Sequence, residues 1–113
     1  MKIWVDDVRP APDGYIWKSS VIDVKHFIEY CEEIYNACMY NLDYKTAKNY
    51  KIELIDLDHD AGNYITFGGD YIKILDWLEE TNRNYPIRIH SMNPVGRENM
   101  RRIIKKNNWK EIK

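Results

Sequence analysis

Residues 53–60 read Glu-Leu-Ile-Asp-Leu-Asp-His-Asp, a short apolar segment that runs directly into polar side chains. A short apolar run rich in branched residues and closed by polar ones is typical of a buried strand. Further short apolar segments predict the other strands, and they lie at residues 3–5, 15–17, 87–89 and 109–112. We therefore expect a sheet of five strands.

Helical patterns lie between most of these strands. Apolar residues repeat at intervals of three and four over residues 21–39, and shorter patterns cover residues 71–81 and a segment that begins near Pro94. Ser20 and Asp70 are the predicted N-caps of the first two helices. Strands that alternate with helices favour an α/β sandwich around a mostly parallel sheet.

Two segments leave alternatives open. Residues 9–14 are too few for an ordinary helical crossover, so residues 15–17 form either a hairpin partner or an edge strand. Residues 40–51 fit an extra helical turn followed by a loop. The first crossover of the sheet is therefore expected to be reduced.

The composition describes one small globular domain over residues 1–113. Hydrophobic residues at 44% and charged residues at 31% exclude a disordered chain, and no apolar run is long enough for a transmembrane helix. A formal net charge of −1 leads us to expect neither duplex DNA nor a membrane as a partner. The chain begins without a signal-peptide pattern, and Cys31 and Cys38 are too far apart on one helix for a disulfide, so we expect reduced thiols and a cytoplasmic protein. The oligomeric state stays open.

Polar side chains follow three of the predicted strands, at the point where each strand ends. In an open α/β sheet, ligands bind beyond the carboxyl ends of the strands. The three groups are Asp6, Asp7 and Arg9; Asp58, His59 and Asp60; and His90, Ser91 and Asn93. We expect these groups to converge on one pocket.

Asp6 and Asp7 form an adjacent pair of carboxylates at a strand end. Such a pair is favourable when a cation lies between its members, and Asp58 from the next strand would complete a set of oxygen ligands. Oxygen ligands favour Mg²⁺ or Mn²⁺ over Zn²⁺. The alternative is a pair that only caps a loop and accepts backbone N–H bonds.

The Asp58-His59-Asp60 cluster carries a histidine between two carboxylates. A histidine exchanges protons near neutral pH, and a flanking carboxylate orients it, so His59 is a candidate acid, base or metal ligand. The alternative is a hydrogen-bonded turn with a structural histidine. Asp56, which lies between apolar strand residues, is interpreted as pairing locally and not as catalytic.

Residues 90–96, His-Ser-Met-Asn-Pro-Val-Gly, lead from a buried strand into the start of a helix. Free N–H groups and a partial positive charge collect at such a start, and Ser91 and Asn93 add side-chain donors, so the segment through Gly96 is a candidate phosphate site. An equally favoured alternative is that Asn93 is only an N-cap and that His90 lies in the core. Trp17 or a tyrosine near the pocket is a candidate for stacking a base.

Together these motifs resemble those of response-regulator receiver domains, with an acidic pair, a phosphoacceptor aspartate and a hydroxyl residue at Asp6-Asp7, Asp58 and Ser91. Residues 6–10, 57–60 and 90–96 are similar to a divergent branch, the cyclic-phosphate-processing receiver-like family. The resemblance covers nearly the whole chain. It implies a three-layer, flavodoxin-like fold and a role in processing or recognising cyclic phosphates of nucleotides or RNA ends.

The leading hypothesis is a metal-dependent phosphoesterase. In it Asp6, Asp7 and Asp58 hold the cation, and His59 or His90, with Asp60, exchanges protons. Ser91, Asn93 and Gly96 would hold the phosphate, and Arg9 would neutralise developing charge. The alternatives are a module that binds a cyclic nucleotide or phosphorylated ligand without turnover, and a receiver that accepts phosphate on Asp58.

Overall fold

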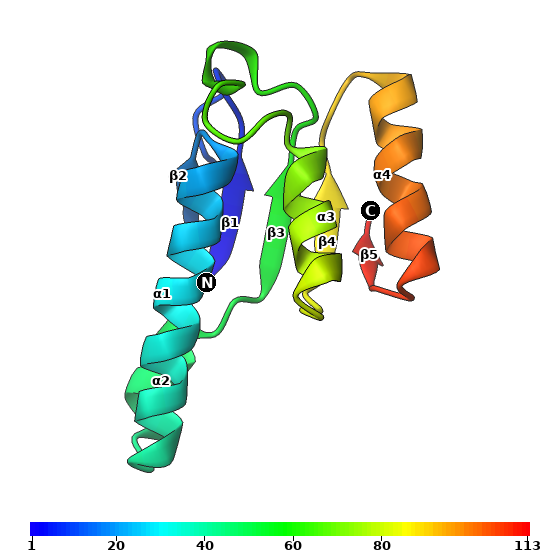
Figure 1. Ribbon diagram of the computed structural model, residues 1–113. Coiled ribbons are helices and arrows are strands. Elements are labelled where there is room, and N and C mark those ends of the chain that lie inside the picture. Colours follow the sequence, from blue (N-terminus) through cyan, green and yellow to red (C-terminus); the bar gives the residue numbers. More distant parts are fainter.

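The computed structural model describes all residues from 1 to 113. Its core is a five-stranded sheet with the order β2-β1-β3-β4-β5, in which every neighbouring pair is parallel (Figure 1). The strands are β1 (Lys2–Val5), β2 (Tyr15–Lys18), β3 (Leu54–Leu57), β4 (Ile87–Ile89) and β5 (Glu111–Ile112). The predicted receiver-like α/β class is confirmed, and the segment left open at residues 15–17 is a parallel edge strand.

Four α-helices and one short 3₁₀ turn connect the strands. They are α1 (Val21–Tyr40), α2 (Tyr44–Tyr50), η1 (Gly62–Tyr64), α3 (Ile72–Glu80) and α4 (Pro94–Lys106). The second open segment, residues 40–51, thus contains the short helix α2, which packs on α1. None of the α-helices combines the length and apolar character needed to cross a bilayer.

The helices α1, α3 and α4 pack on one face of the sheet. The strand order places each of the last three strands on the same side of its predecessor, and right-handed crossovers then put the connecting helices on one face. Figure 1 shows α1 and α3 lying across the same side of the strands. The strand residues of the buried core all point to this face, and they are Ile3, Val5, Ile55, Leu57, Ile87 and Ile89.

The opposite face carries no helix within residues 1–113. Its side chains come from the alternate strand positions, including Trp4, Trp17, Asp56 and Arg88, which share one register across the sheet. The loop from β1 to β2 lies on this side, because the indole N–H of Trp4 donates to the carbonyl of Arg9 at 2.9 Å. The second helix layer of the expected three-layer sandwich is therefore reduced to this loop and to side chains, because the first crossover holds no helix.

Two of the three N-caps considered from the sequence are present in the structure, and one is not. The Ser20 hydroxyl accepts from the N–H of Asp23, and the Asn93 side chain accepts from the N–H of Gly96, as expected of N-caps. The prediction for Asp70 is wrong, since Tyr71 occupies the N-cap position of α3. The Asp70 carboxylate instead accepts from the N–H of Ala61 at 3.0 Å and holds the loop after β3.

Candidate functional site

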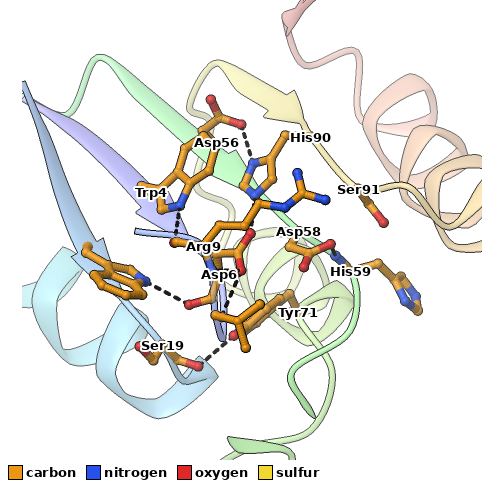
Figure 2. A network of polar contacts seen from close by, with 12 residues as sticks. Trp4, Asp6, Arg9, Ser19, Asp56, Asp58, His59, Tyr71, His90 and Ser91 are labelled. Atoms are coloured by element: carbon orange, nitrogen blue, oxygen red, sulfur yellow. Dashed lines mark hydrogen bonds and ion pairs between the residues drawn. The ribbon is translucent and has the colours of Figure 1, made fainter. Parts of the chain in front are cut away.

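The carboxyl ends of β1 and β3 bring three acidic side chains together. Asp6, Asp7 and Asp58 each offer a carboxylate oxygen, and these atoms all lie within 4.8 Å of one another. Asp58 lies beside Asp6 and Asp7 because its N–H donates to the carbonyl of Val5, the residue before Asp6, at 2.9 Å. Figure 2 shows Asp6 and Asp58 at the centre of a network of polar contacts.

Asp6 is the buried anchor of this cluster, with no exposed surface. One carboxylate oxygen accepts from the N–H groups of Val8 and Arg9, at 3.0 and 2.8 Å, and the other lies 2.9 Å from Nε2 of His90. Burial alone would raise the pKa of Asp6, but the two N–H groups and the imidazole together lower it below its ordinary value. Asp6 is therefore held as a carboxylate.

Asp7 is the opposite case, since its pKa is raised by burial and by the neighbouring carboxylates of Asp6 and Asp58. The side chain lies against Gly62, where an added Cβ would sit 2.2 Å from Oδ2 of Asp7. Gly62 also has a positive φ of 54°. A glycine is thus required here both for the backbone and for the space that Asp7 occupies.

Asp58 is half-buried and closes β3. Its Oδ1 accepts from the N–H of the next residue, His59, at 2.8 Å. Its Oδ2 accepts no hydrogen bond from the chain, which leaves that oxygen available to a cation or a phosphorus atom.

His90 lies between two carboxylates that have no exposed surface. Its Nδ1 is 2.7 Å from Oδ1 of Asp56, and its Nε2 is 2.9 Å from Oδ2 of Asp6. Asp56 also accepts from Arg88 at 3.2 Å, so it pairs locally as the sequence indicates and reaches His90 as well. Both ring nitrogens of His90 are engaged, which gives this side chain the geometry of a positioning residue.

His59 and Asp60 form a pair beside the acidic cluster. Nδ1 of His59 lies 2.9 Å from Oδ1 of Asp60, and the carboxylate of Asp60 is exposed. The His59 ring packs on Gly96 in the first turn of α4, where an added Cβ would lie 2.4 Å from Cγ of the ring. Figure 2 shows the His59 ring turned away from Asp6.

At the start of α4, backbone N–H groups donate to side chains of the same segment. The N–H of Asn93 donates to the Ser91 hydroxyl at 3.1 Å, and the N–H of Gly96 donates to the Asn93 side chain at 3.0 Å. Arg97 donates to the carbonyl of Ser91. Two of the N–H groups expected to hold a phosphate are thus already satisfied, and the Ser91 O–H, the Asn93 amide NH₂ and Arg9 remain as donors.

Arg9 lies in the loop after β1 with an exposed side chain that makes no hydrogen bond or ion pair within the chain. In Figure 2 it extends over the carboxyl end of the sheet on the side where Asp58 and His90 are drawn. Arg9 is therefore the free cation of the site.

Two residues of the site carry no signal in the sequence patterns. Gly62 is one, and Tyr71 is the other, with a buried ring and a hydroxyl that donates to the carbonyl of Ser19 at 2.7 Å. Burial raises the pKa of Tyr71, and the carboxylates of Asp7, Asp6 and Asp58 raise it further. The hydroxyl is therefore a neutral donor on the helix side of the acidic cluster.

The donor set fits a divalent cation. Carboxylate oxygens from two strand ends lie within 4.8 Å of one another, and the pKa of Asp7 is raised by burial and then by the neighbouring carboxylates, whose repulsion a cation would relieve. An all-oxygen set is the preference of Mg²⁺ and Mn²⁺. Asp7 and Asp58 would hold the ion directly, with Asp6 contributing the lone pairs that its hydrogen bonds leave free.

Two cavities lie at opposite ends of the sheet. The larger, of about 640 Å³, is bounded by the residues before β3 and β4 and by the second half of α1, away from the acidic cluster. The smaller, of about 220 Å³, lies on the acidic side and is lined by Ser20, Ile22, Asp23, Tyr64 and Phe67. The larger cavity is therefore not the one that lies near the acidic cluster.

Comparison with known proteins agrees with the motifs. The family model described as cyclic-phosphate processing receiver domain matches residues 1–106. No curated protein and no solved structure shows a significant match.

Proposed function

Because the chain belongs to the family of cyclic-phosphate processing receiver domains, we propose that it is a metal-dependent phosphoesterase acting on a cyclic phosphate of a nucleotide or an RNA end. The observation that carries the proposal is the approach of the Asp6, Asp7 and Asp58 oxygens to within 4.8 Å of one another. Three clustered carboxylates repel one another unless a cation joins them.

Hydrolysis of a cyclic phosphate adds the oxygen of water to phosphorus and breaks one of the two ring P–O bonds. The departing sugar oxygen takes up a proton, and the product is a phosphomonoester. A bound Mg²⁺ or Mn²⁺ supplies a Lewis acid for the phosphoryl oxygen and for the attacking water. Arg9, which has no partner in the chain, adds positive charge where the transition state gains negative charge.

Proton transfer falls to the His59–Asp60 pair in this proposal. The carboxylate of Asp60 contacts Nδ1, so Nε2 is the nitrogen that would exchange the proton once the ring turns from Gly96 towards the acidic cluster. In this proposal His90 is a positioning residue and not the acid or base. Its two nitrogens hold Asp6 and Asp56, so it fixes the acidic cluster and exchanges no proton with substrate.

A second candidate function is binding without turnover. The occupied N–H groups of Asn93 and Gly96 favour it, because they leave few donors to stabilise charge on a transition-state phosphate. In that case the same carboxylates, cation and Arg9 hold a phosphorylated ligand as a sensor does.

Product analysis by phosphorus NMR tests the proposal. The protein is incubated with Mg²⁺ or Mn²⁺ and a panel of 2′,3′- and 3′,5′-cyclic nucleotides. Asp58→Asn is the variant, and Asp76→Asn, which changes a carboxylate on α3 that pairs with Lys73, is the control. A phosphomonoester signal that is lost in Asp58→Asn and kept in Asp76→Asn supports hydrolysis.

Absence of product from every substrate, together with a rise in melting temperature on adding one of them, would replace hydrolysis with binding. A covalent label from a small phosphodonor that disappears in Asp58→Asn would instead identify a phospho-accepting receiver. Each outcome thus selects one of the three functions.

A further inference from the structure

The smaller cavity is an open hollow at the end of the sheet that carries the acidic cluster. Its walls are the first turn of α1, with Ser20, Ile22 and Asp23, and the loop after β3, with Tyr64 and Phe67. The N–H of Ile22 donates to the carbonyl of Phe67 at 3.1 Å, which fixes the loop against the helix. At Gly68 an added Cβ would lie 2.8 Å from Cβ of Val21, so the two walls approach as closely as only a glycine permits.

Two connections place this cavity next to the acidic cluster. Gly62, which the Asp7 carboxylate touches, begins the 3₁₀ turn that ends at Tyr64. Tyr71, the buried neighbour of the three carboxylates, donates to the carbonyl of Ser19, which directly precedes Ser20 of the cavity wall. The cavity and the acidic cluster thus share the loop after β3 and the segment that precedes α1, and a ligand that spans them would have its phosphate at the carboxylates and its other end in the cavity.

The lining combines aromatic rings with an unpaired carboxylate. Tyr64 and Phe67 are 38% and 53% exposed, so their rings are accessible to a ligand in the cavity. Asp23 uses only its backbone N–H, which donates to Ser20, and its carboxylate has no hydrogen bond or ion pair within the chain. Aromatic faces stack on nucleobases, and a carboxylate accepts from donors on a base edge.

We propose that this cavity binds the guanine base of the nucleotide whose phosphate lies at the Asp6, Asp7 and Asp58 cluster. Guanine presents two adjacent donors, N1–H and the N2 amino group, which match the two oxygens of a carboxylate. Adenine and cytosine place an acceptor beside their amino group, and uracil places its N–H between two carbonyls, so each would set an acceptor against Asp23. The proposal rests on the proposed function and adds the base that the site selects.

The test is the base preference of the protein, measured as kcat/KM for the four nucleoside 2′,3′-cyclic phosphates with Mn²⁺. A bidentate carboxylate pair discriminates between bases by about tenfold or more. We expect guanosine to be preferred by that factor and Asp23→Asn to reduce the preference to less than about threefold. Since Asp23→Asn also removes a negative charge near the phosphate, the ratio between bases is the informative quantity.

Glu29→Gln is the matched control, because it removes one exposed carboxylate from the same helix away from the cavity. It should leave the guanosine preference unchanged. Phe67→Ala tests the stacking wall and should raise KM for every base while kcat changes little. Equal kcat/KM for all four bases in the unmodified protein would overturn the guanine assignment and leave the phosphoesterase standing.

Binding without turnover is read separately, from backbone amide resonances of Asp23, Tyr64 and Phe67 titrated with guanosine and adenosine 2′,3′-cyclic phosphates. Shifts with guanosine alone, lost in Asp23→Asn, support the base site even if no substrate is hydrolysed. No shift with either nucleotide overturns it.

Two sources of the same guanosine end are distinguished by a further pair of substrates. A free guanosine 2′,3′-cyclic phosphate and a short RNA ending in guanosine 2′,3′-cyclic phosphate present the same group to the site. A higher kcat/KM for the RNA identifies an RNA terminus as the substrate, and a lower one identifies the nucleotide. If the guanosine preference is absent in both, the proposal fails.

Discussion

The imidazole of His90 lies flat against the indole of Trp4, with ring centroids 3.8 Å apart and planes 1° from parallel. The indole covers one face of a ring whose two nitrogens contact Asp6 and Asp56. Stacking on the indole and the contacts of both ring nitrogens together fix the orientation of the imidazole. The four residues connect the helix-free side of the sheet to the acidic cluster.

Replacing His90 should destabilise the protein. His90→Gln leaves two buried carboxylates without their shared partner, although Asp56 keeps Arg88 and Asp6 keeps two N–H donors. We expect a loss of about 2–4 kcal/mol in the free energy of unfolding. Urea unfolding at neutral pH measures it, with the exposed His26→Gln as the control. Equal stability of the two variants would show that the buried contacts contribute little.

Gly62→Ala should disturb the acidic cluster specifically. The new Cβ would occupy the place of the Asp7 carboxylate, 2.2 Å from Oδ2. We expect Mn²⁺ affinity to fall by about tenfold or more, as for other changes that displace a ligand side chain. Gly14→Ala is the matched control, because Gly14 also has a positive φ but no atom within 4 Å of an added Cβ. Mn²⁺ titration followed by electron paramagnetic resonance compares them, and equal losses would mean that backbone strain is the cause.

Asp7→Asn should have opposite effects on stability with and without metal. Without a cation, the variant removes the cost of burying a charge and the repulsion from Asp6 and Asp58, so its free energy of unfolding should be higher by about 0.5 kcal/mol after solvent screening. With saturating Mg²⁺ the unmodified protein should be the more stable one, since bound metal stabilises only the folded state. Asp13→Asn, in the same loop and exposed, is the control. If Mg²⁺ stabilises the unmodified protein and Asp7→Asn equally, Asp7 is not a ligand.

Glu32 should make stability depend on acid. Arg83 contacts both Glu32 oxygens at 2.8–3.0 Å, and the Tyr85 hydroxyl donates to the same carboxylate. Burial tends to raise the pKa of Glu32, but these donors lower it below its ordinary value of 4.5. The unfolded chain therefore takes up the proton first, so the stabilisation is complete above pH 4.5 and is lost as the pH falls through 4.5 towards the folded pKa.

The corresponding variant is Glu32→Gln. At neutral pH it should lose about 1–2 kcal/mol in the free energy of unfolding, and the difference from the unmodified protein should shrink as the pH falls to 3. Glu33→Gln, an exposed neighbour on α1, is the control. A difference that stays constant from pH 7 to pH 3 would contradict the linkage.

The sequence predicts the fold and the meeting of the acidic residues because both follow from local patterns. Short apolar segments separate the polar groups of residues 6–9, 58–60 and 90–93, and parallel strands bring those groups to one edge. The pairing of His90 could not be predicted, because its partners Asp6 and Asp56 lie 84 and 34 residues away. The roles of Gly62 and Gly96 also escape prediction, since they depend on which side chain lies opposite each glycine.

The fate of Asp70 shows the same limit in a smaller way. An aspartate before a helical pattern is a good N-cap by local rules, but the Asp70 carboxylate accepts from the N–H of Ala61 in the loop after β3. Because this tertiary contact occupies the carboxylate, α3 begins at Ile72 without a side-chain cap.

The loop between Val5 and Tyr15 carries Asp6, Asp7 and Arg9 and is also the only connection between β1 and the edge strand β2. It is tied to both strands, since the Trp17 indole donates to the carbonyl of Asp6 at 2.8 Å and the N–H of Tyr15 donates to the carbonyl of Pro12 at 3.2 Å. Losing or gaining one residue there would shift β2 by one position and turn Trp17 to the other face. Insertions and deletions that remodel the site would therefore also unpair the edge of the sheet, whereas substitutions at fixed loop length can change the site and leave the sheet intact.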